Sequence, residues 1–336
     1  MKERIEWMDF LRGVCIILVI QLHTLLLSGW LRSGGFLDIE SYILSPYRMQ
    51  ILFFLSGLVA SKSINKNNID YFKGKFNNIL YPYLVWSLPY LLVMHGDYFY
   101  NSEYHEIVKS VVGVFVGISD LTWFLYFIFL FFVLAKLAFN FKVNNNVLIG
   151  VSLLLYLAFD KYDLILMYYG DYYSKFLRFN DFFYYFIFFV CGIKLGAGKV
   201  ESLSKNKILV AVSVVACLIV LTIPLAMFLY KNNIVFMPLV LLSIPGIVCA
   251  SRALESRLGF LSVFIRFVGR NSIYFYLTHM LILFILVNAF KGVNSSLIPG
   301  VVFVITLVII SVFLKLKDKH PILDLLFTPK MRKKVK

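Results

Sequence analysis

Apolar runs long enough to cross a bilayer recur along the whole chain and constrain its fold more than any other feature. A helix of about 20 residues spans the ~30 Å hydrocarbon core of a membrane. Ten such runs are expected, at 10–30, 43–61, 79–95, 121–139, 147–159, 180–198, 207–229, 234–251, 267–290 and 297–314. The sequence therefore predicts an all-α polytopic membrane protein with about ten transmembrane helices.

Composition agrees with this class, because 60% of the residues are hydrophobic and only 15% are charged. The first run follows a charged start, as in a signal peptide, but it is too long and no small-x-small cleavage site follows it. We therefore expect it to be the first spanning helix. The four cysteines lie in apolar runs without paired spacing or a nearby histidine cluster. They are interpreted as packing residues, and neither disulfides nor a metal site is expected.

The distribution of the net charge of +15 predicts the orientation in the membrane. If the N-terminus is cytoplasmic, 25 of the 33 Lys and Arg residues fall on the inner side, in segments 1–12, 62–75, 136–146, 194–207, 252–270 and 315–336. The positive-inside rule favours this arrangement, with both termini cytoplasmic. The excess charge is explained by topology, so no nucleic-acid partner is expected. We expect one transmembrane domain over 1–315 and a basic cytoplasmic tail over 316–336 that contacts membrane lipids.

Two ionisable residues of the first run share one helix face. Arg12 and His23 are eleven positions apart, which in an α-helix leaves them about 20° apart around the axis and about 16 Å apart along it. Ionisable groups in a membrane helix are costly and mark functional sites. Asp9 lies three residues before Arg12, where it can pair with the guanidinium. The alternatives are an interfacial anchor for Arg12 and a packing hydrogen bond for His23.

Each of the other polar residues that stand out in the sequence can be interpreted in two ways. Arg48, about one turn into the second run, is either a functional residue or an anchor at the outer interface. His279, deep in the ninth run, is either a structural hydrogen-bond partner or part of a site. Lys73 and Lys75 lie in a basic cytoplasmic loop and could simply follow the orientation rule.

Several motifs occur in the order seen in one known family. They are Asp9-Phe10-Leu11-Arg12-Gly13 with His23 following, FFLSG at 53–57, the basic loop before Tyr81-Pro82, Trp123-Phe124-Leu125, and VGRNSIYFYLTH at 268–279. On these motifs the sequence resembles the membrane acyltransferase 3 family, especially its fucose 4-O-acetylase-like branch. The resemblance covers nearly the whole chain. Arg48 and Gln50 depart from it, because such proteins more often have His and Pro there.

The resemblance implies a ten-helix core that moves an acyl group from cytoplasmic acyl-CoA to a sugar hydroxyl. The acceptor is a cell-surface or exported polysaccharide or its lipid-linked precursor. We therefore expect an O-acetyltransferase of the inner or plasma membrane. Acyl-CoA, most simply acetyl-CoA, is its co-substrate, and no tightly bound cofactor is expected.

An alcohol needs a base to attack a thioester, and histidine is the natural base near neutral pH. His23 is predicted to take the hydroxyl proton and return it to the CoA thiolate, with Asp9 and His279 as its catalytic companions. An acyl-His23 intermediate stays open as an alternative.

The remaining site residues are predicted to bind the two substrates. Arg12, Lys73, Lys75 and Arg270 would hold the CoA phosphates, and Arg48 and Trp123 would face the acceptor. The competing function is a sugar-lipid transporter or flippase in which His23 and His279 relay protons.

Overall fold

The computed structural model is built from helices throughout the residues it describes. Those residues are 5–30, 36–94, 96, 100–101, 104–116, 122–169, 179–227, 234, 236–291, 293 and 295–329. The prediction of an all-α fold is confirmed, since no strand occurs in these ranges. Each of the ten expected apolar runs contains helix over its described residues.

Six helices of the described part of the chain are long and apolar enough to cross a membrane. They are Glu6–Leu27, Trp123–Asn140, Asp181–Leu203, Phe236–Arg257, Ser272–Ala289 and Ile298–Lys317. The helices in the other four runs are shorter or more polar over their described residues. The protein is thus a multi-pass membrane protein. Ten spans and cytoplasmic termini stay predictions.

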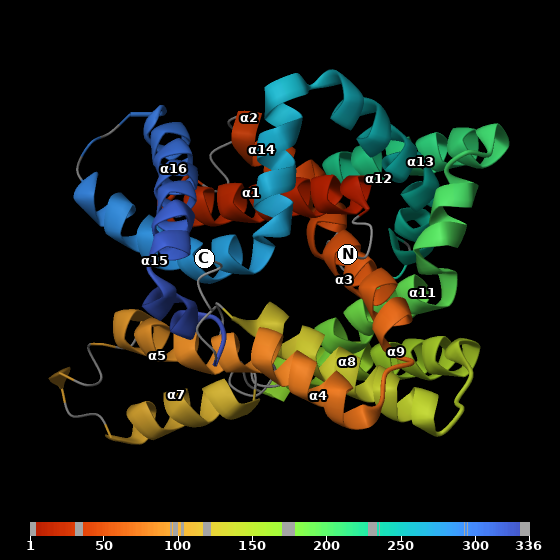
Figure 1. Cartoon of the computed structure of the whole chain (residues 1–336), viewed down its shortest axis with the longest axis horizontal. Helices are drawn as coiled ribbons and strands as arrows, with labels where there is room; N and C mark the ends of the chain where they lie inside the picture. The colour runs from red at the N-terminus through yellow and green to blue at the C-terminus, as the bar shows by residue number, and fades with distance from the viewer. Residues whose placement is uncertain are drawn as a thin grey trace. The chain divides into compact units, whose positions relative to one another are not determined.

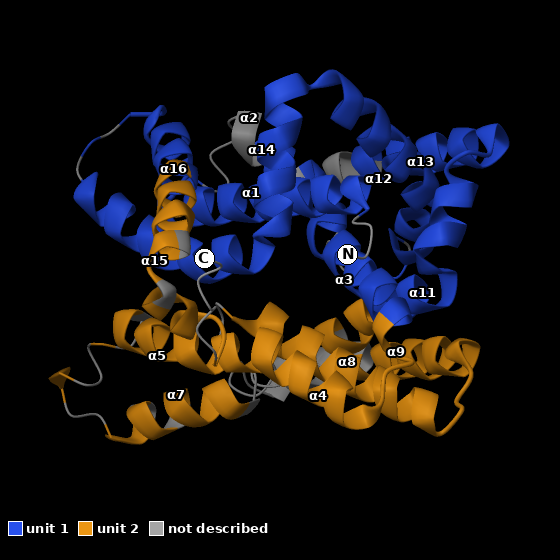
Figure 2. Ribbon diagram, in the orientation of Figure 1, with its two compact units in different colours: residues 1–62, 187–307 blue, residues 63–186, 308–336 orange. Residues whose placement is uncertain are grey.

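The helices group into two compact units, which Figure 2 distinguishes by colour. The first unit comprises Met1–Lys62 and Ile187–Leu307. It contains α1 (Glu6–Leu27), α2 (Phe36–Ile43), α3 (Ser45–Ser63), most of α11 (Phe179–Leu203), α12 (Lys207–Met227), α13 (Phe236–Arg257), α14 (Gly259–Arg270), α15 (Ser272–Ala289) and the start of α16 (Ile298–Lys319).

The second unit comprises Ser63–Phe186 and Val308–Lys336. It contains α4 (Asn68–Lys75), the π-helix η1 (Phe76–Leu80), α5 (Tyr81–Met94), α7 (Tyr104–Val116), α8 (Trp123–Asn140), α9 (Asn145–Tyr169), the end of α16 and the 3₁₀ helix η2 (Pro321–Leu326).

Glycines bring the backbones of the first unit into direct contact. Figure 1 shows α14 crossing α1. At the crossing, a Cβ on Gly13 would overlap the carbonyl oxygen of Ile265, and a Cβ on Gly269 would overlap that of Asp9. Small residues permit such close approach between helices in membranes. Gly57 and Gly192 do the same where α3 meets α11.

The ninth apolar run is broken into two helices. We expected one helix over 267–290, but α14 ends at Arg270 and α15 begins at Ser272. Asn271 lies between them with φ −107° and ψ 21°, outside the helical region. The carbonyl oxygen of Phe267 accepts from the side-chain amide of Asn271 at 2.9 Å and from its backbone N–H at 3.1 Å, so both contacts close the last turn of α14.

In the second unit, two buried lysines bind polar groups near the ends of helices. Lys136 is 2% exposed, and its ammonium donates to the carbonyl oxygens of Ile64 and Lys66, each at 2.8 Å. These carbonyls follow the end of α3 and lack helical partners. Lys317 forms a buried ion pair with Asp324 at 2.9 Å.

The segment after the tenth run packs against α5. It was expected to begin a cytoplasmic tail at 316, yet α16 continues to Lys319 and η2 follows. The Trp86 indole donates to the carbonyl oxygen of Leu326 at 2.9 Å, and the Tyr81 hydroxyl donates to that of Leu325 at 2.7 Å. The basic end, 330–336, lies outside the described residues.

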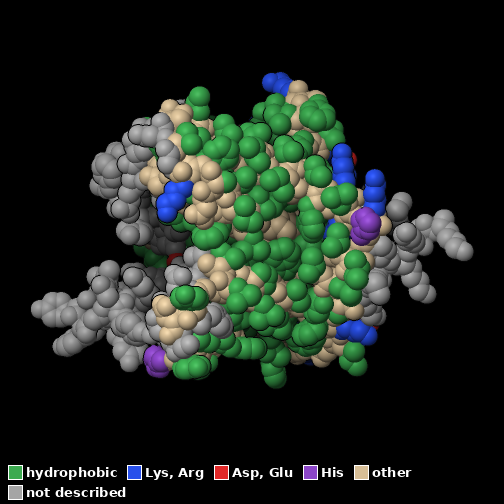
Figure 3. Space-filling model, turned by 90° about the vertical axis from the view of Figure 1, so that its left-hand side faces the viewer, with side chains coloured by type: hydrophobic (Ala, Val, Ile, Leu, Met, Phe, Trp, Pro, Cys, Tyr) green, Lys and Arg blue, Asp and Glu red, His purple; other side chains and the backbone are tan. Residues whose placement is uncertain are grey.

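Apolar side chains are turned outward along the spanning helices. On α16, Val301, Val304, Val308 and Val312 lie on one face and are 42–56% exposed, whereas Thr306 is fully buried. Hydrophobic side chains likewise cover much of the face drawn in Figure 3, with Lys and Arg near its margins. Large exposed apolar surfaces mark contact with a membrane or a partner, and here they fit lipid.

Replacing Gly13 by Ala should force α1 and α14 apart, because the new methyl group would overlap a carbonyl oxygen. Overpacking of this kind costs about 1–3 kcal/mol. Thermal unfolding in detergent measures the loss. Gly300→Ala in α16 is the matched control, because a Cβ there meets no atom within 4 Å. Equal melting temperatures for the two variants would contradict a tight α1–α14 contact.

Candidate active site

Helix α1 carries three of the predicted site residues on one continuous stretch of helix. It runs from Glu6 to Leu27 without a break, so the expected spacing of Arg12 and His23 holds in the structure. The N-cap residue of α1, Ile5, makes no side-chain capping hydrogen bond. Glu6 and Asp9 place two carboxylates in the first turn of the helix. Negative charge at this end of a helix is favourable.

His23 contacts His279, from α15 of the same unit. Nδ1 of His23 lies 2.9 Å from Nε2 of His279, and the rings are nearly parallel with centroids 5.1 Å apart. His279 is completely buried, whereas His23 is half-buried. The other ring nitrogen of His279, Nδ1, lies 2.6 Å from the carbonyl oxygen of Tyr276 and 3.1 Å from that of Phe275. The two histidines predicted separately from the sequence therefore form one pair.

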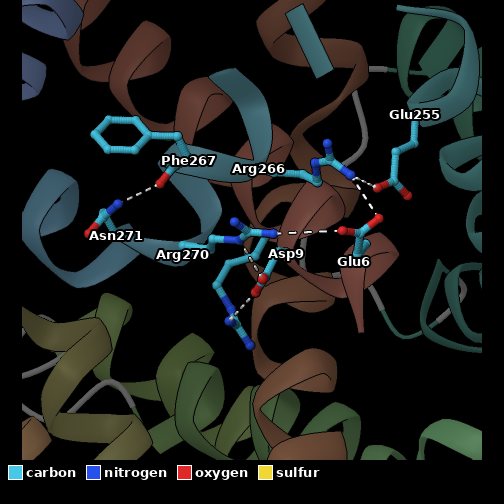
Figure 4. A network of polar contacts seen from close by, with 8 residues as sticks. Glu6, Asp9, Glu255, Arg266, Phe267, Arg270 and Asn271 are labelled. Atoms are coloured by element: carbon cyan, nitrogen blue, oxygen red, sulfur yellow. Dashed lines mark hydrogen bonds and ion pairs between the residues drawn. The ribbon is translucent and has the colours of Figure 1, made fainter. Parts of the chain in front are cut away.

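Asp9 joins two of the predicted arginines, and its contact with Arg270 is visible in Figure 4. It lies 3.7 Å from Arg12, which is the pair expected from their spacing. Its second oxygen accepts from Nε of Arg270 at 3.2 Å, across the α1–α14 contact. The side chain of Asp9 is only 11% exposed, against 22% for Arg12 and 39% for Arg270. Asp9 is thus the inner carboxylate between two more accessible cations.

A second set of ion pairs adjoins Asp9. Arg266 donates to Glu6 at 2.8 Å and to Glu255 at 2.7 Å, and Glu6 also lies 3.9 Å from Arg270. The network of Figure 4 therefore balances three arginines with three carboxylates. An incoming anion would share Arg12 or Arg270 with a carboxylate, because each of these arginines already has one beside it.

Sequence reasoning did not assign Glu6, Glu255 or Arg266 to the site. The spacing of Glu6, Asp9 and Arg12 by three residues could have revealed Glu6, because such residues are neighbours on a helix. Glu255 gave no such signal. Its pairing with Arg266 depends on the turn between α13 and α14.

Arg48 is buried within the first unit. It is 6% exposed and donates to Ser41 Oγ of α2 at 2.7 Å. The reading of Arg48 as an anchor in the outer headgroup layer is therefore wrong. Helix α2 is also tied to α1, because Gln21 donates to Glu40 at 2.9 Å. The expected role of Arg48 in acceptor binding stays a prediction.

Trp123, Lys73 and Lys75 belong to the second unit. Trp123 begins α8 and packs on Phe127 and Tyr185, with ring centroids 5.3 and 5.6 Å away. Lys73 is exposed in the last turn of α4.

Lys75 is half-buried, with Nζ 3.4 Å from the centre of the Phe132 ring. Burial, together with a smaller effect of the nearby charge of Lys66, lowers the pKa of Lys75 to about 8. The ring face of Phe132 favours the cation and opposes this shift. Lys75 is therefore a cation whose charge is lost at mildly alkaline pH.

A family model described as an acyltransferase domain matches residues 5–316. The chain belongs to the acyltransferase 3 family. The match covers nearly the whole chain, including α1, α3, α8 and α15, which carry the motifs found in the sequence. No curated protein and no solved structure matches the chain significantly. Membership of the acyltransferase 3 family makes this protein a membrane acyltransferase and favours acyl transfer over sugar-lipid transport.

Breaking the Arg266 pairs should destabilise the first unit. Arg266→Gln leaves Glu255, 13% exposed, without its cation, whereas Glu255→Gln leaves Arg266 paired with Glu6. We expect Arg266→Gln to cost about 1–3 kcal/mol and Glu255→Gln less.

Melting temperatures of both single variants and the double variant measure the coupling. The double variant should lose less than the two single losses added together, because the buried charge left by Arg266→Gln is then removed. Additive losses would show that this contact contributes nothing to stability.

Proposed function

We propose that the protein is an integral membrane O-acyltransferase that moves an acyl group, acetyl in the simplest case, from acyl-CoA to a sugar hydroxyl. The acceptor we propose is a cell-surface or exported polysaccharide, or its lipid-linked precursor, and the location is the inner or plasma membrane. The observation that carries the proposal is the His23–His279 pair in a chain of the acyltransferase 3 family. A half-buried histidine backed by a second one is suited to serve as a base.

The donor approaches from the arginine network in this proposal. Arg12 and Arg270 would exchange part of their contact with Asp9 for the CoA phosphates, since guanidinium groups bind phosphate with two parallel hydrogen bonds. Along the unbroken α1, about 16 Å separates Arg12 from His23. An extended pantetheine arm has a similar reach, so one donor molecule could contact both. By the positive-inside rule, the basic segments favour a cytoplasmic position for the arginine end of α1.

The chemical step is a single displacement. His23 takes the proton of the acceptor hydroxyl as its oxygen forms a bond to the thioester carbonyl carbon. The tetrahedral intermediate collapses, the carbon–sulfur bond breaks, and the proton passes from His23 to the leaving thiolate. The products are an ester on the sugar and free CoA, and His23 is again neutral. Asp9 stays in the donor site, where it holds the two arginines.

Transfer of label from radioactive acetyl-CoA tests this proposal. Membrane vesicles exposing the cytoplasmic face should move label into lipid-linked or polymeric glycan with the wild type. His23→Ala should lower the rate at least about 100-fold, because it removes the base. His105→Gln, at an exposed position of α7, is the matched control.

Equal transfer by wild type and His23→Ala at equal protein levels would exclude His23 as the base. If the wild type moves label from none of acetyl-CoA, succinyl-CoA and longer acyl-CoA donors, acyl-CoA-dependent transfer is wrong. The transport function is then the next to be tested.

Lys75 should make donor binding depend on pH if it contacts the CoA phosphates. Its pKa is lowered to about 8, so its charge is present below that pH and is lost above it. The KM for acyl-CoA should therefore rise by up to about tenfold between pH 7 and pH 9. Lys75→Arg keeps its charge over this range, and its KM should stay flat. Parallel curves for the two proteins would remove Lys75 from the donor site.

A further inference from the structure

We propose that His279 is a positioning residue that fixes the tautomer of His23, so that Nε2 of His23 is the basic nitrogen. The catalytic meaning of this inference rests on the proposed function, in which His23 is the base. The tautomer itself follows from contacts within the first unit and does not depend on any activity.

The direction of the hydrogen bonds is set by two backbone carbonyls. Nδ1 of His279 faces the carbonyl oxygens of Tyr276 and Phe275, at 2.6 and 3.1 Å. A carbonyl oxygen can only accept a hydrogen bond. Nδ1 of His279 must therefore carry the hydrogen and donate it, in the turn of α15 that precedes it.

The second nitrogen of His279, Nε2, accepts a hydrogen bond because the ring is neutral. The side chain is completely buried, and among the described residues its polar contacts are His23 and two carbonyl oxygens, with no carboxylate. A buried charge without a counter-ion is costly, so the ring is neutral. A neutral imidazole has one hydrogen. Because Nδ1 holds it, Nε2 of His279 has a lone pair and accepts.

His23 is the donor to that lone pair. Its Nδ1 lies 2.9 Å from Nε2 of His279, so Nδ1 carries the hydrogen in the neutral ring. The remaining nitrogen, Nε2, then bears the lone pair. In histidine bases generally, a hydrogen bond at one ring nitrogen determines which of the two nitrogens is protonated. Here the orienting group is another histidine anchored by backbone, in place of a carboxylate.

The arrangement specifies the path of the proton in acyl transfer. The acceptor hydroxyl gives its proton to Nε2 of His23 as the oxygen–carbon bond forms, and Nε2 returns it to sulfur as the carbon–sulfur bond breaks. The hydrogen on Nδ1 of His23 stays in its bond to His279 throughout. His279 keeps its own hydrogen and touches neither substrate. The near-parallel stacking of the rings, 28° apart, also limits rotation of His23.

Nitrogen-15 NMR of the histidine rings tests the tautomer directly. The full chain is prepared with ring-labelled histidine in lipid nanodiscs at neutral to mildly alkaline pH, and the signals are assigned by their loss in His23→Gln and His279→Gln. Both rings should show a protonated Nδ1 and an unprotonated Nε2. A His23 ring with its hydrogen on Nε2, or a doubly protonated His279, would overturn the inference whether or not the protein transfers acyl groups.

Variants of His279 then test the positioning role in the labelled-donor assay. His279→Leu removes the acceptor, so kcat should fall at least about 100-fold, with the KM for acyl-CoA changed less than about threefold. His279→Gln keeps an oxygen able to accept from Nδ1 of His23, and should recover kcat to within about tenfold of wild type. His105→Gln is the control for histidine replacement in general.

The pattern across these variants separates positioning from packing. Equal loss in His279→Leu and His279→Gln, with the His23 tautomer unchanged in His279→Gln, would overturn the positioning role. If His23→Ala stays active while the spectra show the expected tautomers, the hydrogen-bond direction is right and the base assignment is wrong.

Discussion

The contact between the backbones of α1 and α14 is the constraint on which the candidate site depends. Gly13 and Gly269 each lie against a carbonyl oxygen of the opposite helix, with no room for a side chain. This approach brings Arg270 to the carboxylate of Asp9 and Arg266 to that of Glu6. With side chains at these two positions, the axes would separate and the ion pairs would lengthen. The glycines therefore determine where the charges lie, although they carry none.

Much of the site could be predicted because it is local. The shared face of Arg12 and His23, and the pairing of Asp9 with Arg12, follow from the period of one helix, and the structure has both on an unbroken α1. The all-α class followed from the apolar runs alone. Helical periodicity predicts which side chains are neighbours only within a single helix.

The rest depends on contacts between distant segments, which periodicity does not encode. His23 and His279 are 256 residues apart, and nothing in either local pattern shows that they touch. The break at Asn271 was missed because the residues on both sides of it are apolar enough for one long run. The anchor alternative for Arg48 came from its depth in the run, and neither its burial nor its hydrogen bond to Ser41 of the preceding helix could be predicted from that depth.

The packing of η2 has a practical meaning for work with this protein. Tyr81 and Trp86 of α5 donate to carbonyl oxygens of Leu325 and Leu326, and Asp324 holds the buried Lys317. Shortening the chain at the boundary suggested by its basic composition, after residue 315, would strip α5 of these acceptors and expose its aromatic surface. An affinity tag or fluorescent fusion therefore belongs beyond residue 329, where the contacts of η2 with α5 and with Lys317 are kept.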